Sequence, residues 1–565
     1  MNKELFGVFG DRDDFYRHRS RRQFDEVLEG PTLTVGIRDP GLGIPSRSSV
    51  ADRDDGCCVV WGEAFPPNSA GANTAAWLLD TFKEYGTDAL SVLNGSYVAV
   101  VDTDDETIVA TDPIRSWECF YTDDCGVRTF GTDAAAVART TDRHDVHRDS
   151  LREFMHIGTV FGEKTLLEQL HRVPFDGFLT ASEVGTLERF VYNPQEFDYV
   201  DELAARLRRA IARRSRNPGR EGLLLSAGYD SRLLLSQVPS IEHCYTIGSA
   251  GDPETVGAEK LAAQYGAEHT VFEPDERYLM AGPEKTMYSQ GIKESLHIHH
   301  AGYTGGIDVD TMYHGLLCDT LIRGHFVERK HVDMFGKRLP LPQLEPDPDP
   351  VQVLVDRFGY VLEKSETVAR CTNVDGDPHS FVLDAIGSEL VTYYDRAENV
   401  HNRLDCCGIA NQPTLPFRVH LADNYLESML ITDVELLDWH LTTPPEHRNT
   451  RTFLKAIEQL DPDILRHSPP DRPHKSQVLN AIRGYVCKKT PFVRSPQGAW
   501  PDRIEVFNQY NLDQRLFPDR AYLHELPPRH KLRANDALGW LDHCVSTDLR
   551  TEELLAPNYS SVALD

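Results

Sequence analysis

Residues 221–237 read EGLLLSAGYDSRLLLSQ. The apolar run 222–225 predicts a short buried strand, and the Leu-rich run after Asp230 predicts a helix. Between them, small residues let backbone N–H groups approach a phosphate, and the N-terminus of the following helix adds its positive end. The stretch therefore predicts a pyrophosphate-binding loop between a strand and a helix.

Each position of this loop has a predicted role. The expected pyrophosphate-binding residues are Ser226, Ala227, Gly228, Tyr229, Asp230 and Ser231. The two serines can donate hydroxyl groups, whereas a carboxylate beside phosphates requires Mg²⁺ between them. The alternative is an ordinary Gly-containing turn in which Ser and Asp act as helix caps.

The surrounding sequence extends the alternation of helices and strands. Leu203, Leu207, Ala210 and Ile211 recur at helical spacing before the loop, and after it come a strand at 243–247, a helix at 254–265 and a strand at 269–272. Such alternation predicts parallel crossover units, hence a doubly wound sheet that binds ligands at the carboxyl ends of its strands. Residues 339–350, LPLPQLEPDPDP, predict a surface loop or insertion, and the chain beyond them is mostly helical in pattern.

The first part of the chain has a different pattern. Short apolar runs at 5–9, 57–61, 97–101 and 107–110 are separated by Asp, Gly and Pro, which predicts a strand-rich sandwich. One helix is expected at Thr74–Tyr85. The adjacent Cys57 and Cys58 are expected in the core.

The amino-acid composition limits the classes of partner that the protein can bind. The formal net charge of -29 and pI near 5.2 argue against duplex nucleic acid or an anionic membrane. The dispersed acidic residues are typical of proteins from salt-rich cytoplasm, with a merely acidic protein as the alternative. No signal peptide, transmembrane segment, Cys-x-x-Cys motif or disulfide framework is recognised, so a cytoplasmic protein with reduced thiols is expected. The composition is compatible with a homodimer.

The loop and its surroundings resemble the asparagine synthetases. SAGYDS resembles the SGGxDS loop of these ATP pyrophosphatases, and GSAGDPETVGAEKLAAQYGAEHTVFE (248–273) resembles the segment that follows it. MYHGLLCDTL (312–321) is similar to the family's SGEGxDE segment, with Gly315 and Asp319 matching. The resemblance implies ATP and Mg²⁺ as cofactors, Gly315 at the nucleotide, and Asp319 as the carboxylate that shares the metal with Asp230.

The resemblance also covers the front of the chain. FGVFGDRDD (6–14) resembles the CGIFG start of the family's N-terminal-nucleophile glutaminase domain, and residues 92–121 and 171–194 resemble later parts of it. It implies an Ntn-hydrolase-like α+β sandwich over 1–195 and a PP-loop synthetase domain, α/β and doubly wound with a helical C-terminal region, over 196–565.

The front domain departs from the family at its reactive positions. Phe6 stands where the family has its nucleophilic Cys, Trp61 replaces the Asn of the N-G-E triplet while Gly62 and Glu63 match it, and Thr74 stands where the family has a glutamine-binding Asp. Without a thiolate and a free terminal amine, glutamine hydrolysis has neither nucleophile nor base. A structural or docking role is therefore expected for this domain.

The synthetase half departs from the family around its chemistry. Leu316 stands where the family has a Glu, and Thr320 replaces the Glu after Asp319. Lys475, with Arg466 as an alternative, is the candidate for the family's late Lys, so the predicted catalytic residues are Asp230, Asp319 and Lys475. His297, His299 and His300 are expected on the pocket wall or a polar surface, with a metal cluster as the alternative.

Three functions follow from these observations. The leading hypothesis is an ATP-dependent amide ligase that activates a small carboxylate as an acyl-adenylate, releases pyrophosphate and transfers ammonia or an amine. The second is a non-catalytic nucleotide-binding or scaffold protein derived from such an enzyme. The third is a glutamine-hydrolysing asparagine synthase proper.

Overall fold

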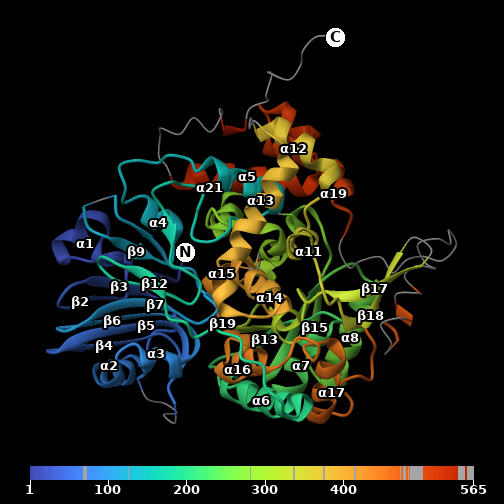
Figure 1. The fold of residues 1–565 in the computed structure, drawn as a ribbon, viewed down its shortest axis with the longest axis horizontal. Helices are drawn as coiled ribbons and strands as arrows, with labels where there is room; N and C mark the ends of the chain where they lie inside the picture. The colour runs from blue at the N-terminus through green and yellow to red at the C-terminus, as the bar shows by residue number, and fades with distance from the viewer. Residues whose placement is uncertain are drawn as a thin grey trace.

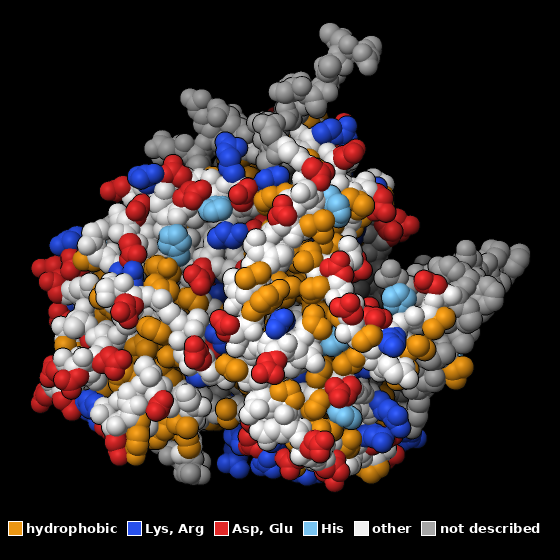
Figure 2. Space-filling model, viewed as in Figure 1, with side chains coloured by type: hydrophobic (Ala, Val, Ile, Leu, Met, Phe, Trp, Pro, Cys, Tyr) orange, Lys and Arg blue, Asp and Glu red, His pale blue; other side chains and the backbone are white. Residues whose placement is uncertain are grey.

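The chain forms an antiparallel sandwich followed by a parallel sheet enclosed by helices (Figure 1). In the computed structural model the described residues are 1–67, 73–124, 126–279, 282–334, 337–372, 376–412, 415–470, 472–474, 479–480, 483, 501–544 and 554–555. No helix among them combines the length and apolar character that a membrane crossing needs. Acidic and basic side chains are interspersed over the face shown in Figure 2.

The sandwich consists of two six-stranded antiparallel sheets. The first has the order β10-β8-β9-β1-β3-β2 and the second the order β12-β11-β7-β6-β5-β4. The bounds are β1 Glu4–Val8, β2 Glu26–Glu29, β3 Thr34–Arg38, β8 Phe120–Thr122, β9 Thr129–Gly131 and β10 His171–Arg172, then β4 Ser49–Arg53, β5 Gly56–Phe65, β6 Asn94–Thr103, β7 Thr107–Thr111, β11 Gly177–Leu179 and β12 Val184–Thr186.

Alternation along β5 places side chains on both faces of the second sheet. Val59 and Trp61 belong to a core shared with Val35 and Ile37 of the first sheet. Cys58 and Val60 instead pack with residues of α2 (Thr74–Tyr85) and α3 (Asp88–Val92), which cover the outer face. The predicted sandwich, the helix at Thr74–Tyr85 and the core position of the Cys pair are confirmed, and the nine described cysteines are all buried free thiols.

The parallel sheet has the order β15-β14-β13-β16-β19. Its strands are β13 Glu221–Leu224, β14 Ile241–Ile247, β15 Glu268–Phe272, β16 Thr311–His314 and β19 Leu426–Met429, and its first three helices are α6 Tyr199–Arg214, α7 Tyr229–Gln237 and α8 Pro253–Tyr265. Neighbouring residues of β14 pack into different hydrophobic cores on the two faces of the sheet. Cys244 packs with α6 to α8, and Tyr245 packs with Leu421 of α15 (Leu415–Asn424). The predicted doubly wound sheet is confirmed.

One local prediction is wrong. Residues 339–344, expected within a loop, belong to β18 (Lys337–Leu344), which pairs antiparallel with β17 (Arg329–Met334). A two-stranded ribbon exposes one backbone edge of each strand, and a proline whose nitrogen faces that edge removes no ladder hydrogen bond. The next helix begins at Pro350.

Helices dominate the C-terminal region, as predicted. They are α11 Pro350–Arg357, α12 Ser365–Thr372, α13 Pro378–Val391, α14 Val400–Ala410, α15, α16 Val434–Thr442, α17 Thr450–Leu460, α19 Arg503–Gln509, α20 Leu512–Leu516 and α21 Pro528–Cys544. The last of these returns to the front domain and packs on α5 (Arg148–Ile157). Arg533 donates to the carbonyl oxygens of Met155, His156 and Ile157 at 3.0, 2.8 and 2.8 Å, satisfying the last carbonyl groups of α5.

Candidate functional site

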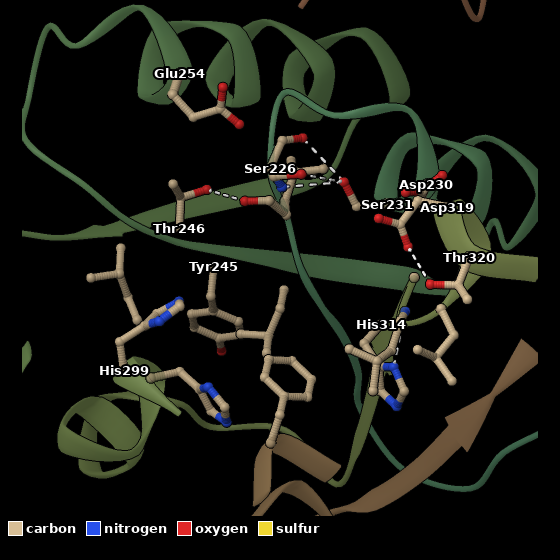
Figure 3. A pocket seen from close by; sticks show the side chains of 18 of the residues that line it. Ser226, Asp230, Ser231, Tyr245, Thr246, Glu254, His299, His314, Asp319 and Thr320 are labelled. Carbon is tan, nitrogen blue, oxygen red and sulfur yellow. Dashed lines mark hydrogen bonds between the residues drawn. The ribbon is translucent and has the colours of Figure 1, made fainter. Parts of the chain in front are cut away.

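The loop after β13 is closed by its two serines. Ser226 Oγ lies 3.1 Å from Ser231 Oγ, and the backbone N–H of Gly228 donates to Ser226 Oγ at 3.2 Å. The N–H of Ser226 donates to Ser231 Oγ at 3.2 Å (Figure 3). The strand, loop and helix thus follow the order that the sequence predicts, and the loop lies at the N-terminus of α7.

A buried guanidinium group fixes the backbone of this loop by hydrogen bonds. Arg232 donates to the carbonyl oxygens of Gly228 at 2.8 Å and Ala227 at 2.5 Å. It also donates to the carbonyl oxygens of Ile464 at 3.2 Å and His467 at 2.6 Å. Since its side chain is fully buried, these contacts fix the loop against the segment after α17. This residue was not predicted, because its partners are backbone groups that leave no motif in the sequence.

The second predicted segment meets the loop from the neighbouring strand. A Cβ atom on Gly315 would lie 2.7 Å from the Cβ of Asp230, so only glycine allows this approach. Asp319 follows on α10 (Cys318–Leu321), and both aspartates line one pocket of about 620 Å³ together with Ser226 and Ser231. The structure therefore brings together the predicted residues of both segments.

Burial and nearby charges shift the pKa of Asp230. Burial raises the pKa of Asp230 to about 6, helped by the charge of Asp319 and opposed by that of Arg323. Arg323 donates to Asp230 Oδ2 at 2.8 Å, whereas Asp230 Oδ1 is buried without a hydrogen-bond partner in the described part of the protein. An unpartnered carboxylate oxygen beside a second carboxylate fits a divalent cation whose other ligands are water and phosphate.

The turn between β16 and α10 is strained. Leu317 has φ 62°, the left-handed region that a branched side chain rarely adopts. Leu317 stands at the position of the second glycine in the family's SGEGxDE segment. The turn therefore adopts the left-handed conformation at a residue that is not glycine. Leu316 is partly buried against the apolar core, and Thr320 Oγ1 accepts from the Gln412 side chain at 3.2 Å.

The remaining pocket wall is aromatic and polar. It includes Tyr245, Thr246, His299, His300 and His314. Burial, with neighbouring His420 and His299, lowers the pKa of His300 well below its usual value, which favours the neutral ring. No metal-binding group of three or more His, Cys, Asp or Glu occurs among the described residues, and the side chain of His297 is outside them.

Two predicted residues are not brought to the site. Lys475 lies outside the described residues, and its role stays a prediction. Arg466 is exposed and does not line the pocket. The cation found next to Asp230 is instead Arg323, only four residues after Asp319. Proximity to the matched aspartate was the signal that could have identified it.

The front domain has no exposed nucleophile at the expected position. Phe6 is fully buried in β1, where its ring packs edge-on against Phe15 with centroids 5.7 Å apart. Trp61 is buried against Trp117 at 4.8 Å. Thr74 begins α2 and is also buried.

Glu63, which matches the N-G-E triplet, contacts the synthetase half. Its Oε1 accepts from Ser428 Oγ at 2.8 Å, and its Oε2 lies 3.3 Å from Arg214 Nε. Arg214 also pairs with the buried Asp433. The residue thus belongs to a buried ion-pair network that joins the two halves.

Comparison with known proteins identifies one family segment. Residues 202–291 match the asparagine synthase family. The matched range runs from α6 past α8, so it contains the whole 226–231 loop and ends before Asp319. A search of curated proteins gives no match.

Two solved structures are weakly similar to the chain. One is described as the allosteric regulatory enzyme of purine biosynthesis, with 12% identity, 49% of this chain and 76% of that chain covered, and a TM-score of 0.19. The other is glutamine phosphoribosylpyrophosphate (PRPP) amidotransferase from B. subtilis complexed with ADP and GMP, with 12% identity, 68% and 87% covered, and a TM-score of 0.19. At these scores neither likeness bears on the function.

Proposed function

Because residues 202–291 match the asparagine synthase family, we propose that the chain is an ATP-dependent carbon–nitrogen ligase. It would activate a small carboxylate as an acyl-adenylate, release pyrophosphate and transfer ammonia or an amine. One observation supports this most strongly: the loop at Ser226–Ser231, Gly315 and the two aspartates meet in one pocket at the carboxyl ends of adjacent parallel strands.

The residues of the pocket suit a leaving pyrophosphate. Backbone N–H groups of the loop and the N-terminus of α7 provide donors for anionic oxygens, and Arg232 holds their geometry. Asp230 and Asp319 would hold Mg²⁺, which neutralises the charge developing on the phosphates. The protein then contributes mainly by positioning the carboxylate against the α-phosphate.

The nitrogen source is proposed to be ammonia or an amine other than glutamine. Phe6 offers no nucleophile, and the side chain of Glu63 is held in the ion-pair network between the halves. We therefore propose that the front domain supports the synthetase half structurally. Glutamine-dependent asparagine synthesis is disfavoured for the same reasons.

A second candidate function has its own support. Asp230 forms an ion pair with Arg323, and Leu316 offers no acid or base beside the nucleotide. Both features suit a protein that binds a nucleotide without completing the reaction. The two candidates differ in pyrophosphate release.

The test is pyrophosphate release with MgATP across a panel of carboxylates and amines. The wild type should release pyrophosphate with at least one pair of substrates, and Asp230→Ala and Asp319→Ala should not. Asp55→Ala is the matched control, because Asp55 is an exposed carboxylate of the front domain that pairs only locally with Lys83 at 2.5 Å. Nucleotide binding without turnover would favour the scaffold. Unchanged MgATP binding and pyrophosphate release in both site variants would refute the assignment of the loop.

A further inference from the structure

A glutamate side chain accepts a hydrogen bond from one of the backbone N–H groups of the loop. The backbone N–H of Ala227 donates to Glu254 Oε1 at 2.7 Å. Glu254 lies in the first turn of α8 and lines the same pocket as Ser226 and Asp230. In Figure 3 it extends from its helix toward the loop that carries Ser226.

This contact is built into the packing of α8. A carboxylate in the first turn of a helix ordinarily interacts with the free N–H groups of that helix. Glu254 also reaches a loop 27 residues earlier in the chain. A Cβ atom on Gly257, one turn later, would lie 2.7 Å from the Cβ of Ala227, so helix and loop are in close contact.

A carboxylate oxygen and a phosphate oxygen compete for the same backbone N–H donor. Both are anionic acceptors, and a charge-assisted bond of this kind is about twice as strong as a neutral one. A pyrophosphate group that uses the Ala227 donor must displace Glu254. It must then remain in a pocket lined by three carboxylates, Asp230, Glu254 and Asp319. Arg323 pairs with Asp230, and no Lys or Arg is among the described residues that line the pocket.

We propose that Glu254 is an internal competitor for the pyrophosphate subsite and determines which anions the loop accepts. Only a ligand that brings compensating cations and contacts elsewhere in the pocket displaces it, so metal-bound polyphosphate is selected over metal-free polyphosphate. The proposal rests on the proposed function, because it assumes that the loop binds pyrophosphate.

The test is calorimetry of pyrophosphate, with and without Mg²⁺, against the full chain and Glu254→Gln. The amide keeps the size of the side chain and removes its charge. We expect magnesium pyrophosphate to bind about tenfold or more tightly to the variant, the factor that corresponds to one charged hydrogen bond. Metal-free pyrophosphate should gain more than the magnesium complex. Glu259→Gln is the control, since Glu259 lies exposed on the same helix.

A second measurement needs no ligand. Hydrogen exchange of a peptide containing Ala227 should be faster in Glu254→Gln than in the wild type and unchanged in Glu259→Gln. Equal or weaker pyrophosphate binding by Glu254→Gln would overturn the proposal, as would unchanged exchange. If neither the wild type nor Glu254→Gln binds magnesium pyrophosphate while exchange responds as expected, the proposed function fails and the competitor role fails with it. If both bind it equally, the competitor role alone fails.

Discussion

Replacing Asp230 with Asn should separate stability from function. The folded protein raises the pKa of this carboxyl group from 3.8 to about 6, chiefly by burial. A raised pKa of a carboxyl group means that the ionised form destabilises the folded state. This effect is absent below pH 3.8, grows between pH 3.8 and 6, and is fully present above pH 6.

The size of the effect follows from the shift. About two pKa units correspond to about 3 kcal/mol, and the side chain is 21% exposed, so we expect a gain of about 1–3 kcal/mol for the neutral variant at pH 7. The same variant removes the negative charge that a metal requires. The ligand-free protein should therefore become more stable while it loses MgATP binding.

Urea unfolding at pH 7 and pH 4, combined with calorimetry of MgATP, measures both effects. The unfolding midpoint of Asp230→Asn should exceed that of the wild type at pH 7, and the two should converge at pH 4. Asp55→Asn should change neither property, because that carboxylate is exposed. A variant that is less stable than the wild type at pH 7, or that binds MgATP normally, would refute the reasoning.

Three further results are expected. The purified protein should not convert glutamine to glutamate, because Phe6 replaces the nucleophile; turnover that persists in the Cys57→Ser and Cys58→Ser variants would contradict this. Ser226→Ala should weaken MgATP binding by a factor of about 2 to 10, since it deletes one neutral hydroxyl worth about 0.5–1.5 kcal/mol, and calorimetry that shows complete loss would assign this residue a larger role. Glu294→Gln should destabilise the protein by about 3 kcal/mol at pH 7, since two arginines of α21, outweighing burial, lower the pKa of this carboxyl group from 4.5 to about 2. That difference should fade in urea unfolding as the pH falls from 4.5 toward 2, and a difference independent of pH would exclude the charge as its cause.

The residues of the site that were predicted from the sequence lie in short, continuous segments of the chain. The loop at 226–231 lies between an apolar strand and an apolar-faced helix, and the periodicity of both neighbours predicts their structure. Gly315 and Asp319 came from the resemblance to a family segment, and the structure brings both to the loop.

The parts that sequence did not predict depend on distant partners. Arg323 and Glu254 act on groups 93 and 27 residues away. Arg323 lies in no recognised motif, and the resemblance of residues 248–273 to the family assigned no role to Glu254. The strand β19 contains a charged residue, Glu427, so its pattern does not look apolar. The charge is tolerated because Arg418 and His314 bond to it in the interior.

The docking of α21 on α5 affects the order in which the molecule can be completed during synthesis. The last strand of the sandwich ends at Thr186, and the helix that satisfies the carbonyl groups at 155–157 begins at Pro528. At about 5–20 residues per second the ribosome needs roughly 20–70 s to make the intervening chain. During that interval the end of α5 relies on water for its hydrogen bonds, and the surface that α21 later covers is exposed to chaperones and proteases. A chain truncated before Pro528 would therefore have all the strands of the sandwich but would leave the end of α5 uncovered.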